Sequence, residues 1–289
     1  MKAYKGFNKD LTCMGYRYEI GKTYECEDAE VCDHGFHACL RPADVFAYYA
    51  PVLSRYCEVD VDEDGLSRSN DDSKVAARRI TIVREISLQE LHEAQLEYAR
   101  DHAEESKTGG NWSAVTGGYR STVTGGNRSS VTGGNRSAVT GGDGSAVTGG
   151  NRSSVTSGNR STVTGGDESA VTGGDRSAVT GGDRSAVTGG DRSAVTGGDE
   201  SAVTGGDRSV AVSRGSVSVG HNGLGVCRGN GCRIRGGISA VLVIAEENTT
   251  DYNIATWKAF VVDGETIKAD TWYKLIDGEL VEDDQGGPK

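Results

Sequence analysis

The chain has 289 residues, of which 43 are glycine and only 35% are hydrophobic, and its formal net charge is −11. Globular proteins have about 45–50% apolar residues, so one conventional core of this length is excluded. Three prolines are too few for a collagen helix. The acidic balance, with no basic cluster, argues against a nucleic-acid partner.

Neither a secretory leader nor a membrane span is visible in the sequence. The longest apolar run, Ile238–Ala245, is far too short to cross a bilayer. Seven cysteines, an odd number without a leader, indicate free thiols in a reducing compartment. We therefore expect a soluble cytoplasmic protein without membrane contact.

The segment 1–108 is expected to form a small α+β domain. Alternating apolar residues predict short strands at Lys2–Phe7, Arg17–Glu19, Tyr56–Val61 and Ile80–Ile86. Pro42 favours the first turn of a helix that reaches Tyr49. Ser87 and Glu90 have the spacing of a capping box, which predicts a second helix that extends to about Glu105.

Three thiols and two imidazoles lie within fourteen residues of this domain. They are the candidate metal ligands Cys26, Cys32, His34, His37 and Cys39. The intervening five, one, two and one residues match no common closed zinc site. Strand alternation also places His37 and Cys39 on one face. We therefore interpret the segment as core side chains and expect no bound metal or other cofactor.

Residues 109–236 are dominated by an octapeptide with the consensus Ser-Ala-Val-Thr-Gly-Gly-Asp-Arg. Serine recurs at the first position from Ser113 to Ser209, and valine fills the third position from Val115 to Val203. This strict period predicts a β-solenoid. Alternation places Val and Ser inside and Ala and Thr outside. The Gly-Gly pair is expected at a corner that needs positive φ or close backbone approach.

The charged corner positions predict the length of one coil. Glu168 and Glu200 replace arginine and lie four octapeptides apart. With two octapeptides, about 16 residues, per coil, each Glu lies about 4.8 Å from an Arg of the next coil. The octapeptides then form about six coils.

The residue before that arginine is Asp seven times, Asn four times and Tyr once. Free exchange of Asp and Asn predicts a turn role and argues against calcium, which would require Asp. The predicted turn and edge residues are Asp175, Arg176, Asp183, Arg184, Asp191 and Arg192.

The outward threonines form the predicted binding surface, for a protein partner whose identity the sequence does not reveal. They are Thr116, Thr124, Thr132, Thr140, Thr148, Thr156, Thr164, Thr172, Thr180, Thr188, Thr196 and Thr204.

After Ser209 the period shortens to seven residues, and apolar residues occupy the second and fourth strand positions. This predicts a change of the inward face, with the stack continuing to Cys232. Cys227 and Cys232 are interpreted as inward thiols, since no second cysteine pair accompanies them.

Residues 237–289 predict a β-rich cap, because the last coil of a solenoid exposes strand edges and an apolar interior. Strands are expected at Ile238–Ala245, Lys258–Val262 and Trp272–Leu275, with turns at Asp263-Gly264 and Asp277-Gly278. Trp257, Phe260, Trp272 and Tyr273 are the expected covering residues. The cap is also the expected contact of any homo-oligomer.

The octapeptide resembles the repeat of bacterial ice-nucleation proteins. Ser185–Thr188 match its serine, inward aliphatic residue and closing threonine, with Gly182 at the corner. The resemblance implies a solenoid. Ice binding in that family is attributed to outward Thr-x-Thr rows, which here remain only at Thr122–Thr124 and Thr162–Thr164.

Both ends resemble proteins common in phages and prophages, which join an uncharacterised N-terminal domain to a repeat region. The resemblance rests on Lys5–Phe7, Tyr18–Tyr24, Gly35–Cys39 and Ala43–Tyr49, and on Tyr252–Ile254, Val261–Gly264 and Ile267–Tyr273. It implies no activity. If the protein is phage-encoded, the cytoplasm in which we expect it is that of the host cell.

The Gly-Phe-His-x-Cys step at Gly35–Cys39 also resembles ADP-ribosyltransferase-like folds, in which an early His contacts NAD and a later Glu assists catalysis. His37 is therefore the one candidate catalytic residue. No Ser-Thr-Ser or Glu-x-Glu arrangement follows, so the resemblance implies a degenerate head.

Three functional hypotheses follow from the sequence. The first is a non-enzymatic, phage-derived solenoid that serves as a scaffold or binding surface for a host or phage partner. The alternatives are an NAD-binding head carried on a solenoid and an ice-binding solenoid.

Overall fold

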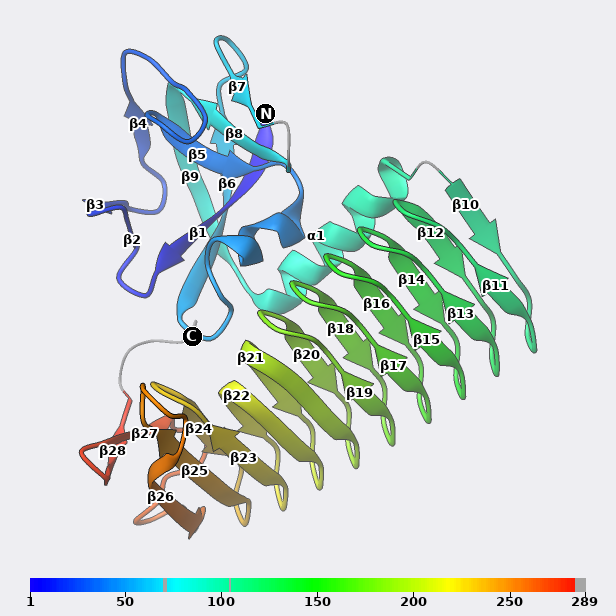
Figure 1. The fold of residues 1–289 in the computed structure, drawn as a ribbon, viewed down its shortest axis with the longest axis vertical. Helices are drawn as coiled ribbons and strands as arrows, with labels where there is room; N and C mark the ends of the chain where they lie inside the picture. Colours follow the sequence, from blue (N-terminus) through cyan, green and yellow to red (C-terminus); the bar gives the residue numbers. More distant parts are fainter. Residues whose placement is uncertain (70–71, 104, 284–289) are drawn as a thin grey trace. The chain divides into compact units, whose positions relative to one another are not determined.

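The computed structural model describes residues 1–69, 72–103 and 105–283 (Figure 1). The protein is mainly β, as the sequence predicts: an N-terminal sheet domain is followed by a β-solenoid of about nine turns. It divides into two compact units, one over residues 1–98 and the other from residue 99 onward.

The N-terminal unit is built on a seven-stranded antiparallel sheet with the strand order β4-β9-β6-β1-β5-β8-β7. These strands are β1 Lys2–Asn8, β4 Thr23–Glu25, β5 Phe36–Cys39, β6 Ser54–Val61, β7 Ser67–Arg68, β8 Lys74–Ala77 and β9 Arg79–Ile86. A small hairpin pairs β2 (Thr12–Cys13) with β3 (Tyr16–Arg17). Phe7, Ile80 and Ile82 are fully buried in the core of the sheet.

Two helical segments accompany this sheet. Pro42 begins a 3-10 helix, η1 (Pro42–Ala47), which is shorter than the predicted helix. The capping box is confirmed, since the Glu90 carboxylate accepts the Ser87 backbone N–H at 2.8 Å and Ser87 Oγ accepts the Glu90 backbone N–H at 3.2 Å. Helix α1 (Leu88–Asp101) ends before Glu105, because Glu105 already pairs with Ser121 in the solenoid.

The solenoid consists of two rows of parallel strands (Figure 1). Row A contains β11 Ala114–Thr116, β13 Ser130–Thr132, β15 Ala146–Thr148, β17 Thr162–Thr164, β19 Ala178–Thr180, the first parts of β21 Ala194–Gly205 and β22 Val210–Val219, then β23 Leu224–Arg228 and β25 Val241–Glu247. Row B contains β10 Glu105–Thr108, β12 Ser121–Thr124, β14 Ala138–Gly141, β16 Ser154–Ser157, β18 Ala170–Gly173, β20 Ala186–Gly189, the later parts of β21 and β22, and β24 Arg233–Gly236.

Paired strands in each row are offset by one coil of about 16 residues through the octapeptides. Val123 pairs with Val139, and Val139 pairs with Val155. This confirms the predicted coil length. The valines from Val123 to Val203 are at most 2% exposed and form one continuous core, so the predicted inward position is also confirmed.

The inward serines form a second, polar ladder. Ser153 N–H donates to Ser169 Oγ of the next coil at 3.1 Å, and Ser169 Oγ in turn donates to the Gly150 carbonyl at 3.3 Å. The same pattern recurs at Ser121 and Ser137. Burying a hydroxyl costs little when it is hydrogen-bonded in this way, which explains how serine can occupy the core.

At the corners, the residue with positive φ is not the one that the sequence predicted. The glycine pairs have negative or extended φ. Positive φ occurs at the residue that follows Asn or Asp, for example Arg152 with φ of 58° and Glu168 with φ of 55°. Glycine is needed for close approach instead, since a Cβ on Gly166 would lie 2.7 Å from the Asn151 nitrogen.

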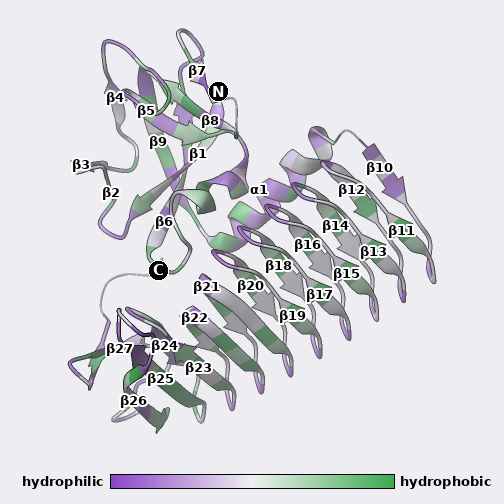
Figure 2. Cartoon of the chain, viewed as in Figure 1, coloured by the Kyte–Doolittle hydropathy of each residue, from purple (hydrophilic) through white to green (hydrophobic). Residues whose placement is uncertain are grey.

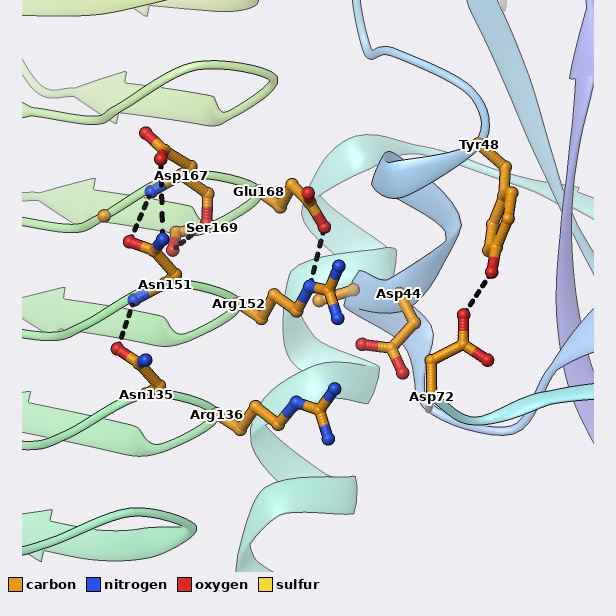
Figure 3. A network of polar contacts seen from close by, with 12 residues as sticks. Asp44, Tyr48, Asp72, Asn135, Arg136, Asn151, Arg152, Asp167, Glu168 and Ser169 are labelled. Atoms are coloured by element: carbon orange, nitrogen blue, oxygen red, sulfur yellow. Dashed lines mark hydrogen bonds and ion pairs between the residues drawn. The ribbon is translucent and has the colours of Figure 1, made fainter. Parts of the chain in front are cut away.

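Asn and Asp at the corners bond between coils rather than within a local turn. Asn135 Oδ1 accepts the backbone N–H of Asn151 at 3.0 Å, and Asn151 Oδ1 accepts that of Asp167 at 3.0 Å (Figure 3). Because only Oδ1 is required, either residue can occupy the position.

The predicted change of inward face after Ser209 is wrong. Ala211 pairs with Val195 and is fully buried, whereas Val210 and Val212 remain outward. The pairing register keeps the original parity, because a one-residue slip would break the continuous ladder. The coils beyond this point are no longer uniform in length: the step from Val210 to its partner Leu224 is shorter than the step from Leu224 to its partner Val241.

The stack continues in parallel through β25, and the antiparallel cap begins with β26 (Ile254–Val261). Strand β27 (Tyr273–Ile276) pairs with β24, and the Asp277-Gly278 turn joins it to β28 (Glu279–Glu282), as predicted. In this part of the chain, hydrophobic residues are frequent in β23, β25 and β26 (Figure 2). Cys227 and Cys232 are buried in the solenoid core, which confirms their interpretation as inward thiols.

The predicted covering residues of the cap behave differently from one another. Tyr273 is 3% exposed and packs on the solenoid core with Phe260, at 5.8 Å between ring centroids. Trp272 stacks over two guanidinium groups of β24, those of Arg233 and Arg235. Trp257 is 62% exposed, so its predicted covering role is wrong: strand alternation turns it outward.

Candidate functional site

The structure divides the twelve predicted threonines between two faces. Row A presents Thr116, Thr132, Thr148, Thr164, Thr180 and Thr196, all of which are exposed. Row B presents Thr124, Thr140, Thr156, Thr172, Thr188 and Thr204. Successive threonines in a row belong to directly paired strands, such as Thr148 and Thr164. The outward side of row A is therefore a continuous sheet surface with a regular hydroxyl row.

This surface changes character at residue 210. Ala194 pairs with Val210, which pairs with Leu224 and then Val241. The outward side chains of Val210, Leu224 and Val241 are 42%, 37% and 41% exposed. Val212 continues the threonine row after Thr196 and is 38% exposed. We call Val210, Val212, Leu224, Val226 and Val241 the aliphatic end of row A.

The predicted edge residues lie at two different corners. The mixed corner follows each row A strand and includes Asp183 and Arg184, and there arginines alternate with Glu168 and Glu200. The arginine corner follows each row B strand and includes Asp175, Arg176, Asp191 and Arg192, without a glutamate among its arginines.

Ion pairs between coils form along the mixed corner. Arg152 Nε donates to Glu168 Oε2 at 2.8 Å (Figure 3), and Arg184 Nε to Glu200 Oε2 at 2.8 Å. This confirms the predicted position of each Glu beside an Arg one coil away. The Arg184–Glu200 pair is exposed, and a pair of this kind contributes about 0.2–1 kcal/mol.

The five candidate metal ligands of the N-terminal unit do not gather at one point. Cys26 Sγ donates to the Asp28 carbonyl at 3.2 Å, Cys32 is exposed, and Cys39 is 4% exposed. Burial raises the pKa of the Cys39 thiol. Within residues 1–69, 72–103 and 105–283, the metal-ligating groups that converge are those of Glu30, Asp33 and His34, all exposed.

His37 is half-buried, and its ring supports the local backbone. Its Nε2 accepts the Cys32 backbone N–H at 3.1 Å, and Lys5 Nζ donates to its carbonyl at 2.7 Å. Burial lowers the pKa of His37, and the charges of Lys5 and Lys74 lower it further. A neutral imidazole with Nε2 engaged holds the loop that precedes β5, and this one ring nitrogen is not free for a ligand.

Next to His37 lies a polar cluster that the sequence did not predict. Lys74 Nζ lies 3.0 Å from Cys32 Sγ and 4.7 Å from the ring centroid of Tyr48. The Tyr48 hydroxyl donates to Asp72 (Figure 3). Burial tends to raise the pKa of Asp72, but hydrogen bonds from Tyr48 and the Lys74 backbone lower it overall. The antiparallel pairing of β5 with β8 brings these residues together, and no local motif signals that pairing.

Comparison with known protein families gives one match, within the N-terminal unit. Residues 1–94 match the model of a domain of unknown function, DUF7666. The match agrees with the predicted uncharacterised N-terminal domain and covers about a third of the chain. The matched region contains the seven-stranded sheet, η1 and the start of α1.

No curated protein and no solved structure matches this chain. Among the described residues, no helix combines the length and apolar character that crossing a membrane requires.

Proposed function

We propose that this protein is a non-enzymatic, phage-derived scaffold that acts in the host cytoplasm and binds a host or phage protein through the outward side of row A. The observation that carries the proposal is the change along this one face from the threonine row to the aliphatic end. Seven free cysteines are in keeping with a reducing compartment.

The two parts of row A suit different contributions to binding. The aliphatic end exposes large apolar side chains side by side on neighbouring strands, which is the usual character of an interface centre. The threonine row offers hydroxyl groups that donate and accept hydrogen bonds at a fixed spacing. A rigid strand stack holds both in place, so little ordering entropy opposes association.

The proposal is tested by capture of proteins from a bacterial lysate on the immobilised full chain, quantified by mass spectrometry. The variant Val212→Glu/Leu224→Glu should reduce the yield of a specific partner at least about tenfold, because charge would be buried at the interface. The control Asp167→Asn/Asp183→Asn alters the mixed corner and should leave the yield unchanged. A set of captured proteins that is identical for all three chains would overturn the proposal.

The same protein preparation tests the two alternatives. If NAD raises the melting temperature of the wild-type chain and the His37→Ala variant loses that shift, an NAD-binding head replaces the scaffold as the function. If the wild type shapes growing ice crystals and Thr148→Glu/Thr164→Glu does not, ice replaces the protein partner. We expect neither effect.

A further inference from the structure

The two corners of the solenoid differ in the ion pairs of their arginines. At the mixed corner, Arg152 and Arg184 each have an acidic partner in the neighbouring coil. At the arginine corner, four successive coils carry Arg160, Arg176, Arg192 and Arg208, stacked about 4.8 Å apart. In the described part of the solenoid, residues 105–283, none of these four side chains makes an ion pair or hydrogen bond.

A second charged row runs beside these arginines. It consists of Asp143, Asn159, Asp175, Asp191 and Asp207, one residue before the arginine position in each coil. Each Oδ1 accepts a backbone N–H of the next coil, for example Asp191 N–H to Asp175 Oδ1 at 3.0 Å. The two rows line a groove of about 510 Å³.

The charges of the groove restrict what it can bind. Four aspartates and four arginines give it a net charge of zero. A nucleic acid or other polyanion would meet the aspartate row one residue away from the arginines, so it is a poor match. A fitting partner carries an acidic and a basic row of its own, with the same repeat of about 4.8 Å.

A second copy of this corner meets that requirement. If two copies are related by a two-fold axis parallel to the solenoid axis, the arginine row of each copy faces the aspartate row of the other. A two-fold axis perpendicular to the solenoid would instead place arginine against arginine. Symmetry thus selects parallel solenoids, with each coil beside the equivalent coil of the other copy.

We propose that the protein forms a parallel homodimer through the arginine corner. In this dimer Arg176, Arg192 and Arg208 of each copy pair with Asp175, Asp191 and Asp207 of the other, and Arg160 meets the neutral Asn159. The repeat distance matches on both sides because both are the same solenoid. This surface differs from the outward side of row A and from the cap, and it does not depend on the partner-binding proposal.

The test is sedimentation velocity on the full chain at low and high salt. We expect a dimer at 50 mM NaCl whose dissociation constant rises at least about tenfold at 500 mM, since salt screens exposed ion pairs. The variant Arg176→Glu/Arg192→Glu/Arg208→Glu should be monomeric. Glutamate already occurs at this repeat position with φ of 55° in Glu168 and Glu200, so the variant should retain the fold.

Mixing two variants separates a specific interface from general destabilisation. The variant Asp175→Asn/Asp191→Asn/Asp207→Asn keeps every Oδ1 and should dimerise weakly by itself. Mixed with the triple-glutamate variant it should form a heterodimer, because its arginines then face the remaining aspartates of the other chain. The matched control Asp167→Asn/Asp183→Asn/Asp199→Asn, at the mixed corner, should dimerise like the wild type.

Three results would each overturn the proposal. One is a wild-type chain that stays monomeric at about 100 μM protein in 50 mM NaCl. At this salt concentration we expect the dimer to be about tenfold tighter than in 500 mM NaCl. Another is a dimer that survives the triple-glutamate substitution. The third is the absence of a heterodimer in the mixture.

Discussion

The N-terminal unit and the octapeptide coils differ in the side chains that form their cores. The N-terminal sheet buries a few large side chains, each used once, such as Phe7 and Ile82, at contacts far apart in sequence. The coils bury one valine and one serine per strand, and identical contacts recur in every coil. One core depends on individual residues, whereas the other divides its stability among many equal units.

This difference explains how a chain so poor in hydrophobic residues can still be ordered. The solenoid core lies between two rows of strands, so a single inward valine per strand fills it. Polar ladders of Ser and of Asn or Asp satisfy backbone groups of the corners. The N-terminal unit needs aromatic packing instead, for example Phe7 against Tyr18 at 5.1 Å between ring centroids.

The largest expected effect is in the N-terminal unit. Phe7→Ala should lower its free energy of unfolding by about 3–5 kcal/mol, because a fully buried aromatic ring leaves a cavity. Hydrogen exchange measured by mass spectrometry should increase in β1 and β6 and stay unchanged in β13–β19. Equal acceleration in both regions would show that the two cores are not independent.

Overpacking a corner should be the most damaging single change in the coils. A Cβ on Gly166 would lie 2.7 Å from the Asn151 nitrogen and 2.9 Å from the Gly150 carbonyl carbon. Gly166→Ala should therefore cost about 3 kcal/mol, measured by urea denaturation. Gly118 holds the same repeat position with open space around its Cβ site, so Gly118→Ala should be near neutral. Equal effects of the two variants would contradict close approach as the reason for glycine.

Breaking the serine ladder should cost somewhat less. Ser169→Ala removes the acceptor of the Ser153 backbone N–H, and the buried donor left without a partner costs about 2 kcal/mol. Ser113, in the first coil, accepts no such backbone bond within the part of the chain that the structure describes, and Ser113→Ala is the control. A loss after Ser169→Ala no larger than after Ser113→Ala would mean that valine packing alone stabilises the coils.

The smallest expected effect is a pH dependence confined to α1. The backbone N–H of Ser87 and the Arg84 guanidinium lower the pKa of Glu90 to about 2. The pKa of Glu in an unfolded chain is about 4.3. The stabilisation of the folded state by ionised Glu90 is therefore fully present above this pH and is lost as the pH falls to about 2. Hydrogen exchange in residues 88–98 should accelerate over this window in the wild type and in a Glu97→Gln control. In Glu90→Gln the acceleration should be absent, and its persistence there would assign the titration to another group.

The sequence predicted well the coil length, the inward valines and the ion pairs of the repeat. The octapeptide period, the invariant valine and the spacing of Glu168 and Glu200 together specify coil length, inward face and ion pairs. Such features are local and recur many times, so each unit supports the same interpretation. The capping box at Ser87 is local in the same sense.

What the sequence did not reveal depends on contacts between strands. The corner arginines, not the glycines, adopt positive φ. At corners such as Gly166, the second glycine is needed because the preceding coil approaches closely. The inward parity after Ser209 follows the register of the coil before it, and the hydrophobic pattern alone suggested the opposite. The contact between Cys32 Sγ and Lys74 Nζ depends on the pairing of β5 with β8.

The sequence by itself thus determined a thin solenoid joined to a small mixed domain. Only the tertiary structure decided that the twelve threonines divide into two faces and that row A ends in exposed aliphatic residues. It also decided that Arg160, Arg176, Arg192 and Arg208 make no ion pair within residues 105–283, whereas Arg152 and Arg184 do. The physical reason is that a period specifies which residues are equivalent, whereas exposure and pairing depend on which coil lies above and below each of them.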